Sequence, residues 1–305
     1  MTIFAMRKFI RNLILPILFP MLGCGVANAR HDADRENTAP ETTGNMTYVE
    51  SRPVTGYYSL EIGRKSVLAT YLSPLKYHGT SYTLSGEWSK AMPFNPRNAI
   101  MHFDGKVCFD NLSNPAGTAR MIGLNAGFKW GISWRNVFPN GVQVTGGGSV
   151  DIDGGAYYLL RNGNNPVQAM ATAAISARLS ASRPFRIGAI DFLIADKVSV
   201  PSLSVFFSPE YGETYYEIYL GNHSGLVHAG WWGNNFRIDN LLSATFDFGR
   251  TAAMIGYRFS VDTQWANNLN TKIFTHSLVL GIVPGGIGLK KKPVRIPSET
   301  IYSIY

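Results

Sequence analysis

Cysteine is almost absent from this chain. Of its two cysteines, Cys24 lies in an N-terminal segment with the features of an export signal, so only Cys108 belongs to the predicted mature chain. A single cysteine excludes an internal disulfide and a Cys-rich structural zinc site there. A membrane-spanning helix is also disfavoured, because the apolar stretch 13–26 has 14 residues, two of them proline, whereas a span needs about 20 residues.

Clustered charge is scarce as well. The chain is mildly basic, but most lysines and arginines stand singly inside alternating runs, whereas nucleic-acid binding requires them on one face. The exception, at 290–292, is explained as a solvated C-terminal charge run. We therefore expect no nucleic-acid partner, and no pattern of ligands indicates a metal or another cofactor.

The N-terminal segment predicts export. Basic residues precede the apolar stretch, and residues 27–29 form a small-x-small site, which predicts a signal peptide over 1–29 with cleavage after Ala29. As an alternative, residues 21–24 loosely resemble a lipobox with Cys24 as the lipidated residue. The polar stretch 30–55 predicts a flexible periplasmic leader.

Strict alternation is the clearest pattern in the remaining chain. Over 171–182, small and aliphatic residues alternate with threonine, serine and Arg178, and only Ala174 interrupts the polar set. Successive side chains of a strand point to opposite faces, so this run predicts a long strand with one apolar and one polar face. Similar runs, separated by turn signals such as the one at 139–141, lie at 82–89, 101–109, 122–135, 142–153, 242–248 and 255–262.

These runs predict an all-β fold: a transmembrane antiparallel up-and-down β-barrel over 56–285, with about 12 strands and a range of 10 to 14. Alternation alone also fits a soluble sandwich or a lipocalin-like barrel. The apolar faces carry essentially no charge, however, and aromatic pairs stand near strand ends, which favours the outer membrane of a Gram-negative bacterium. Residues 286–305 are predicted as a tail beyond a closing strand at 272–283, or as the closing strand itself.

One region resembles a known family. The stretch FFSPEYGETYYEIYLGNH at 206–223, followed by WWGN at 231–234 and IDNLL at 238–242, resembles an uncharacterised family of outer-membrane proteins found in Bacteroides and its relatives. YLLRNGNNP at 158–166 and WANNL at 265–269 fit the same family, and the resemblance covers roughly 71–286. It implies a membrane barrel but no activity, because the family is a domain of unknown function, and it supplies no catalytic residues.

The polar faces of the predicted strands would line the barrel interior. They carry both signs of charge in similar number, so in a narrow barrel they can pair across the interior and plug it. A conducting or substrate-selective pore is the alternative. The glycine run at 146–148 either admits a ligand or permits strand curvature. The charged residues predicted to line the lumen are Glu87, Asp104, Lys106, Lys129, Arg135, Asp151, Asp153, Arg178, Asp247, Arg258 and Asp262.

The segment 210–240 is dense in aromatic residues, asparagine, glycine and histidine. We interpret it as a structured loop, or a strand flanked by loops, that forms a contact surface at the barrel rim rather than a metal site. The residues predicted for this surface are Tyr215, Tyr216, Trp231, Trp232, His223 and His228.

Three functional classes follow. We favour a structural or accessory subunit of an outer-membrane assembly, in contact with outer-membrane lipid and with other outer-membrane or periplasmic proteins. A small solute or ion pore is the first alternative. An outer-membrane lipid hydrolase is the second, but its nucleophile and base must face the same way on one strand. The His-Ser pairs at 223–224 and 276–277 are adjacent, so no catalytic residue is assigned and the chain is more readily explained as a protein without enzymatic activity.

Overall fold

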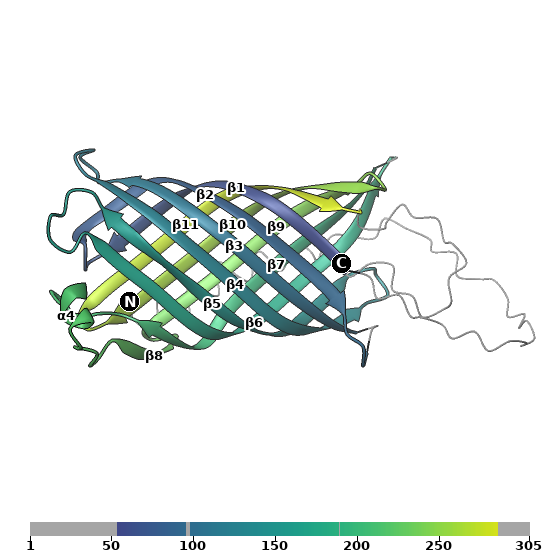
Figure 1. The fold of residues 1–305 in the computed structure, drawn as a ribbon. Coiled ribbons are helices and arrows are strands. Elements are labelled where there is room, and N and C mark those ends of the chain that lie inside the picture. The colour runs from purple at the N-terminus through teal and green to yellow at the C-terminus, as the bar shows by residue number, and fades with distance from the viewer. Residues whose placement is uncertain (1–53, 96–97, 189, 286–305) are drawn as a thin grey trace, which may run out of the picture. The chain divides into compact units, whose positions relative to one another are not determined.

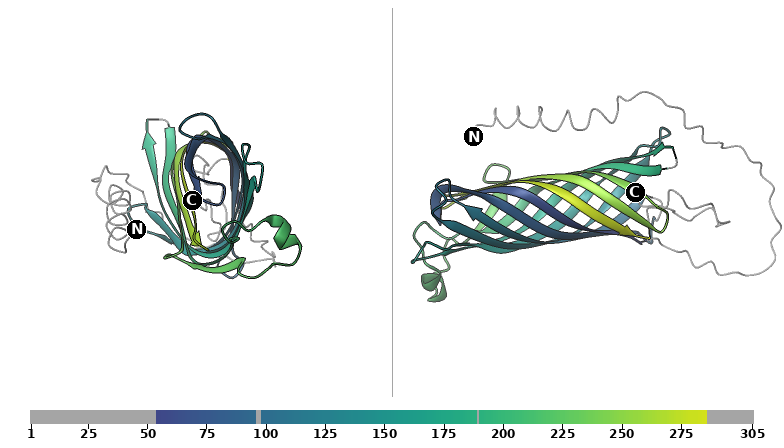
Figure 2. Two further views of the ribbon diagram at one scale, coloured as in Figure 1. Left: turned by 90° about the vertical axis from the view of Figure 1, so that its left-hand side faces the viewer. Right: turned by 90° about the horizontal axis from the view of Figure 1, so that it is seen from above.

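The computed structural model describes residues 54–95, 98–188 and 190–285, which form a closed antiparallel β-barrel (Figures 1 and 2). The predicted signal peptide, nearly all of the predicted leader and the predicted tail lie outside these residues. Within the described ranges, no helix is long and apolar enough to cross a membrane.

Eleven strands and one short helix make up the described chain. They are β1 (Val54–Ala69), β2 (Ser73–Ala91), β3 (Ala99–Ser113), β4 (Arg120–Val137), β5 (Gln143–Leu159), β6 (Val167–Ile187), β7 (Ile190–Phe207), α4 (Tyr215–Tyr219), β8 (Val227–Trp231), β9 (Asn235–Asp247), β10 (Thr251–Ala266) and β11 (Leu269–Pro284). Ten strands close the ring, because β1 pairs with β11 and β6 pairs with β7. The count is at the lower limit of the predicted range, and β11 is the closing strand expected at 272–283.

The wall is interrupted along β7. Residues 191–199 of β7 pair with β9, whereas residues 203–207 pair with the extra strand β8. Pro201 lies between the two stretches and has no N–H to donate to a neighbouring strand, and the register with β6 shifts beside it. The indole nitrogen Nε1 of Trp232 donates a hydrogen bond of 2.5 Å to the Pro201 carbonyl. The shift reverses which residues face outward, so a single alternating pattern could not predict β7.

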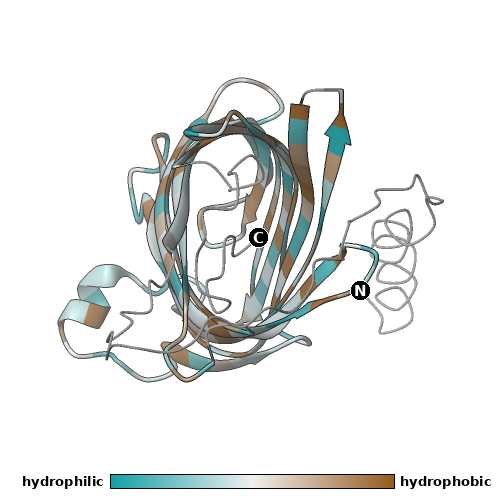
Figure 3. Cartoon of the chain, turned by 90° about the vertical axis from the view of Figure 1, so that its right-hand side faces the viewer, coloured by the Kyte–Doolittle hydropathy of each residue, from teal (hydrophilic) through white to brown (hydrophobic). Residues whose placement is uncertain are grey.

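The two faces of the wall differ as the alternation predicts. On β4 and β6, Leu124 and Ile175 are 61% and 59% exposed on the outside, whereas Ser176 on the inner face is 1% exposed. The ribbon coloured by hydropathy shows apolar and polar residues alternating along the strands (Figure 3). One expectation is wrong: the outer face is not free of charge, because Arg64, Lys76 and Lys272 share the outward phase of β1, β2 and β11. They lie toward the ends of these strands. There, successive residues still point alternately inward and outward, but the outward residues are no longer all apolar.

The two ends of the barrel differ in their connections. The start of β1 and the end of β11 lie at one end, together with the connections at 92–98, 138–142, 188–189 and 248–250. The opposite end carries the loops 114–119 and 160–166 and the segment 208–226, which contains α4. The two ends therefore differ chiefly by the segment 208–226, the longest connection between described strands.

The glycine run at 146–148 permits a close approach of β4 to β5. A methyl group added at Gly147 would lie 2.2 Å from the Ile132 carbonyl oxygen, whereas one added at Gly146 would meet nothing closer than 3.9 Å. We expect Gly147→Ala to lower the free energy of unfolding by about 1–3 kcal/mol, as overpacking does. Gly146→Ala, its matched control, should stay within about 0.5 kcal/mol of the wild type. Urea unfolding of both variants in detergent tests this, and equal stabilities would contradict it.

Candidate functional site

Side chains fill the barrel interior at the end that carries α4. Inward residues of β1–β5 and of the adjoining loops form an apolar cluster, of which Tyr77, Leu112, Met121 and Tyr157 are at most 2% exposed. Across the barrel from them, buried amide–hydroxyl pairs complete the layer: Gln168 donates to Thr271 at 3.0 Å and Gln264 donates to Thr172 at 3.2 Å. We call this layer the outer plug.

A second apolar cluster lies toward the other end of the barrel, where β1 begins and β11 ends. It consists of Tyr57, Leu193, Leu241, Ala252, Met254, Val279 and Val283, all buried. These residues come from β1, β7, β9, β10 and β11, so they cover the opposite side of the ring from most of the outer plug. The interior is therefore packed from two sides, and the charged residues lie between them.

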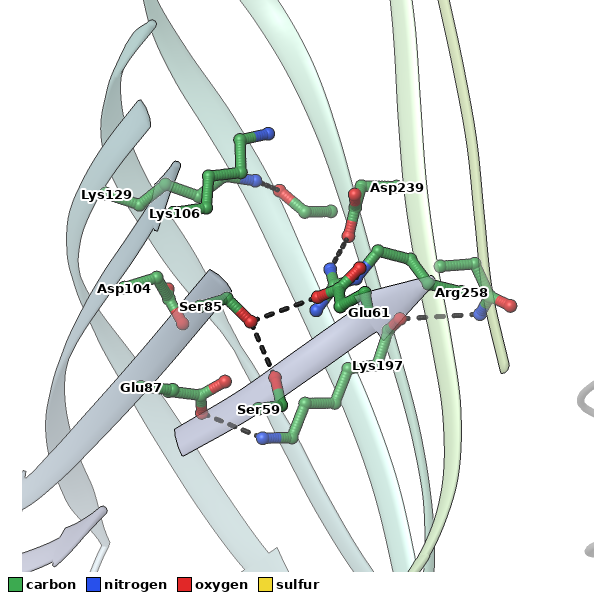
Figure 4. A network of polar contacts seen from close by, with 12 residues as sticks. Ser59, Glu61, Ser85, Glu87, Asp104, Lys106, Lys129, Lys197, Asp239 and Arg258 are labelled. Atoms are coloured by element: carbon green, nitrogen blue, oxygen red, sulfur yellow. Dashed lines mark hydrogen bonds and ion pairs between the residues drawn. The ribbon is translucent and has the colours of Figure 1, made fainter. Parts of the chain in front are cut away.

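Arg178 is the centre of the charged layer. Its guanidinium forms an ion pair with Glu87 at 3.0 Å and another with Asp104. The Lys197 ammonium lies 2.8 Å from the other oxygen of Glu87, and the Tyr57 hydroxyl donates to Glu87 at 3.1 Å. These residues come from β1, β2, β3, β6 and β7, so the cluster connects strands across the barrel interior. Figure 4 shows the contact between Lys197 and Glu87.

Two further arginines pair with carboxylates on neighbouring and distant strands. Arg258 contacts Glu61 at 3.1 Å and Asp239 at 2.6 Å, and Ser85 donates a hydrogen bond of 3.0 Å to Glu61. Arg237 of β9 contacts Asp262 at 2.9 Å and also Asp153 of β5, on the other side of the ring. Each arginine thus binds two carboxylates, which satisfies buried charges that would otherwise be costly.

The only cysteine of the described chain joins a separate cluster under the outer plug. Lys65 lies 2.8 Å from Asp110 and 3.1 Å from the Cys108 sulfur, and the Tyr157 hydroxyl donates to Asp110 at 3.2 Å. Cys108 is 7% exposed. The cluster ties the charged layer to the outer plug through Tyr157.

Two cavities lie among the described residues inside the barrel. The larger, about 200 Å³, is lined by residues of the charged layer and by Cys108 and Tyr157. The smaller, about 40 Å³, lies toward His102, Ser133 and Ser182. Glu87, Arg178 and Lys197 line both cavities, so the Arg178 cluster separates them.

The structure places the predicted lumen residues as follows. Eight line the larger cavity: Glu87, Asp104, Lys106, Lys129, Asp153, Arg178, Arg258 and Asp262. Asp151 is buried beside them, where Ser149 and Ser176 donate to it at 2.6 Å and Lys129 lies at 3.6 Å. Arg135 is buried near the opposite end of β4. Asp247 accepts a hydrogen bond from the Gly249 amide in the turn at 248–250.

Several residues of the charged layer escaped the sequence analysis. They are Glu61, Lys65, Asp110, Lys197, Arg237 and Asp239. In β1, the alternation of Tyr58, Leu60 and Ile62 with Ser59 and Glu61 is the pattern that could have predicted Glu61 as an inward residue. Lys197 stands just before the register shift of β7, where the pattern is broken.

The rim segment 208–226 is held to the barrel by defined contacts. Tyr71 in the turn between β1 and β2 donates to the Glu213 carbonyl at 2.6 Å, and the Ala169 amide donates to the Tyr215 hydroxyl at 2.7 Å. Glu213 accepts from Asn222 at 2.7 Å. Thr214 and Glu217 form a capping box at the start of α4. This box was visible in the sequence, but the expectation of strands and loops alone passed over the short helix.

The predicted contact residues of the rim are spread over this segment and β8. Tyr216 is 68% exposed on α4, which lies outside the ring of strands (Figure 3). Trp231 and Trp232 are 62% and 49% exposed at the end of β8. His223 is exposed in the loop, whereas His228 contacts the Ser208 carbonyl and Tyr215 faces the barrel. Of the predicted set, Tyr216, His223, Trp231 and Trp232 are therefore exposed, whereas Tyr215 and His228 make contacts that hold the loop.

Alkaline pH should loosen this rim segment. Burial, with Tyr215 and Glu213 nearby, raises the pKa of Tyr71 to about 12 from an ordinary 10. A raised pKa means that the protonated phenol stabilises the folded loop below pH 10 and that this contribution is lost as pH rises toward 12. A nitroxide on Leu220→Cys should become more mobile over that range. In a Tyr71→Phe background the label should already be more mobile at pH 8 and the alkaline step smaller; an unchanged step would contradict the assignment.

Comparison with known proteins identifies the family. Residues 15–293 match the family described as "Protein of unknown function (DUF3316)", and the chain belongs to it. The predicted link to Bacteroides stays a prediction, because that description names no organism. No curated protein matches the chain.

Solved outer-membrane barrels are distantly similar. The outer membrane protease OmpT from Escherichia coli has 9% identity and a TM-score of 0.42, covering 80% of this chain and 99% of its own. The transport unit of the autotransporter AIDA-I, also from E. coli, has 8% identity and a TM-score of 0.42, covering 80% and 93%. The translocator domain of NalP from Neisseria meningitidis has 8% identity and a TM-score of 0.37, covering 76% and 88%. Similarity at this level carries no argument about activity.

Proposed function

We propose that the protein is a non-conducting barrel of the bacterial outer membrane that serves as a structural or accessory subunit of a larger outer-membrane assembly. An apolar outer face around a polar interior is the surface pattern of a transmembrane barrel. The predicted export signal would direct such a barrel past the inner membrane, and the long connection at 208–226 favours the cell exterior for the end that carries α4.

The filled interior of the barrel is the observation that favours a non-conducting barrel over a pore. The outer plug fills one end with side chains that are almost fully buried. The Arg178 cluster lies where the two cavities meet. A water-filled channel needs a continuous polar path, and both the buried side chains of the outer plug and the paired charges around Arg178 lie across such a path. The charges pair with one another, which supports a structural role for them.

A lipid hydrolase receives less support from the positions of its candidate residues. On β11 the His276 ring is exposed on the outer face and contacts the Tyr257 hydroxyl, whereas Ser277 is 3% exposed on the inner face. Adjacent residues of a strand cannot form the nucleophile–base hydrogen bond of such an enzyme. If nothing passes through the barrel, its exposed rim is the surface through which it can bind other proteins. Tyr216, Trp231 and Trp232 give that rim the aromatic side chains that are enriched at protein interfaces.

Pull-down of the tagged protein at native expression, after crosslinking in whole cells, tests the accessory role. The proposal predicts co-purification of one or more defined outer-membrane or periplasmic proteins. A variant that carries Tyr216→Ser and Trp231→Ser should lose them while keeping the barrel folded, whereas Trp134→Ser, at the opposite end of the wall, should retain them. Recovery of the wild-type protein alone would contradict the proposal.

A further inference from the structure

Five basic side chains gather on the outer face of three neighbouring strands. Along β1 the outward positions Tyr58, Leu60 and Ile62 are exposed and apolar, and the same phase continues to Arg64. The corresponding outward positions of β2 and β11 hold the other four residues, which are Lys76, His78, Lys272 and His276. All five lie in the halves of their strands nearer the end that carries α4, with Lys76 and Lys272 next to that end and Arg64 and His276 toward mid-strand.

The register brings these residues into one patch. Leu68 is paired with Lys76 on one side and with Lys272 on the other. Two positions away on β1, Ser66 is paired with His78, and two further on, Arg64 is paired with His276. Directly opposite residues of neighbouring strands have Cβ atoms about 4.5–5.5 Å apart. Arg64 and His276 are therefore within reach of one group, whereas Lys76 and Lys272 flank Leu68 two strand spacings apart. A headgroup with more than one phosphate can contact several of these five residues, which we call the basic patch.

The patch has no acidic counterpart. None of its residues is in an ion pair within the described ranges, and the remaining positions between them are Leu68, Ser66, Thr80 and Phe274. Inside the barrel, by contrast, each arginine of the charged layer binds two carboxylates. His276 contacts the Tyr257 hydroxyl, whereas Arg64, Lys76, His78 and Lys272 have no such contact within the described ranges and can bind an external anion.

The patch also lies at a boundary of the wall. Toward the middle of the barrel, the outward positions that follow are Ile62 on β1, Leu278 on β11 and, beyond Thr80, Tyr82 on β2, which are 45%, 51% and 46% exposed. The apolar face that would contact lipid chains therefore ends where the basic patch begins. Lipid headgroups lie at this level in a bilayer.

We infer that the basic patch binds the phosphate groups of an anionic lipid in the outer leaflet. Arg64 can donate two parallel hydrogen bonds to a phosphate, the two lysines add point charges, and the His78 imidazole adds a donor. The acyl chains of the same lipid would lie along Ile62 and Leu278. This inference rests on the proposed outer-membrane location, but not on the barrel being closed or having protein partners.

A titration with a phosphorylated lipid tests the inference. We would measure binding of bisphosphorylated lipid A to the detergent-purified barrel by native mass spectrometry. Arg64→Gln combined with Lys76→Gln and Lys272→Gln should weaken binding by about tenfold to a hundredfold, given the attraction of each cation to an anionic lipid surface. Lipid A stripped of its phosphates should bind the wild type as weakly as it binds this triple variant.

A matched control separates the patch from net charge. Lys90→Gln, Arg183→Gln and Arg250→Gln together remove three cations from the opposite end of the barrel and should change binding less than twofold. Equal losses in the two triple variants, or equal binding of lipid A with and without phosphates, would overturn the inference. The heat-induced shift on gels verifies folding, and the single variant Lys272→Gln, expected to lose severalfold, replaces the triple variant if that does not fold. Conductance and pull-down results would be unaffected either way.

Discussion

Arg178→Met is expected to lower the free energy of unfolding by about 3–5 kcal/mol, because it removes the one cation of the described ranges that contacts both Glu87 and Asp104. Lys197 still neutralises part of the charge on Glu87. Asp104 then loses the partner that holds its charge in the interior. Urea unfolding of the barrel in detergent or lipid vesicles, followed by tryptophan fluorescence, gives the measurement.

Two companion variants make the result specific. Arg183→Met removes an arginine from the same strand whose guanidinium lies over the Phe185 ring, 5.3 Å from its centre, and should cost less than about 1 kcal/mol. Adding Asp104→Asn to Arg178→Met should recover part of the loss, since it removes the carboxylate left unpaired. If Arg178→Met proved no more harmful than Arg183→Met, the charged layer would not stabilise the barrel.

The second large effect concerns access to Cys108. In the wild type this thiol is 7% exposed and lies beneath the outer plug, so a water-soluble maleimide should modify it only when the barrel opens locally. Replacing both Tyr77 and Tyr157 with alanine removes two of the largest buried side chains of the plug. We expect the labelling rate of Cys108 to rise about a hundredfold, since reagent can then reach the larger cavity without local opening.

Outward tyrosines provide the control for this experiment. Tyr82 and Tyr158 are 46% and 42% exposed on the outer face of β2 and β5, and their replacement with alanine should leave the labelling rate within a factor of about two. Labelling would be followed by mass spectrometry on the mature chain, in which Cys108 is the only predicted cysteine. A plug variant that labels no faster than the wild type would show that these tyrosines do not close the interior.

Alternation predicted the architecture because a membrane barrel repeats one rule on every strand. The run at 171–182 places Ile175 outward and Ser176 inward as expected, and Arg178 reaches the interior. The same rule failed at β7, since one shift beside Pro201 reverses the faces on either side of it. It also failed at Arg64, which occupies an outward position of β1 although its side chain is charged.

Pairing inside the barrel was harder to predict than inward position. Arg237 and Asp153 are 84 residues apart in the sequence, and they meet only because the ring brings β9 and β5 to face each other. No local pattern contains that information. The helix α4 is the opposite case, because its capping box at Thr214 and Glu217 is local and readable, but five residues among strand signals are too few to produce a helical period.

Planar-bilayer recording of the purified wild-type barrel tests the central claim, that the interior is closed, most directly. With the outer plug and the Arg178 cluster in place, insertion of the folded protein should add no stepwise current in potassium chloride at voltages that the bilayer tolerates. A heat-shift gel of the same preparation confirms that folded barrel was added, and a known porin confirms that the bilayer reports insertion. Reproducible single-channel steps from the folded wild-type barrel would contradict a closed interior.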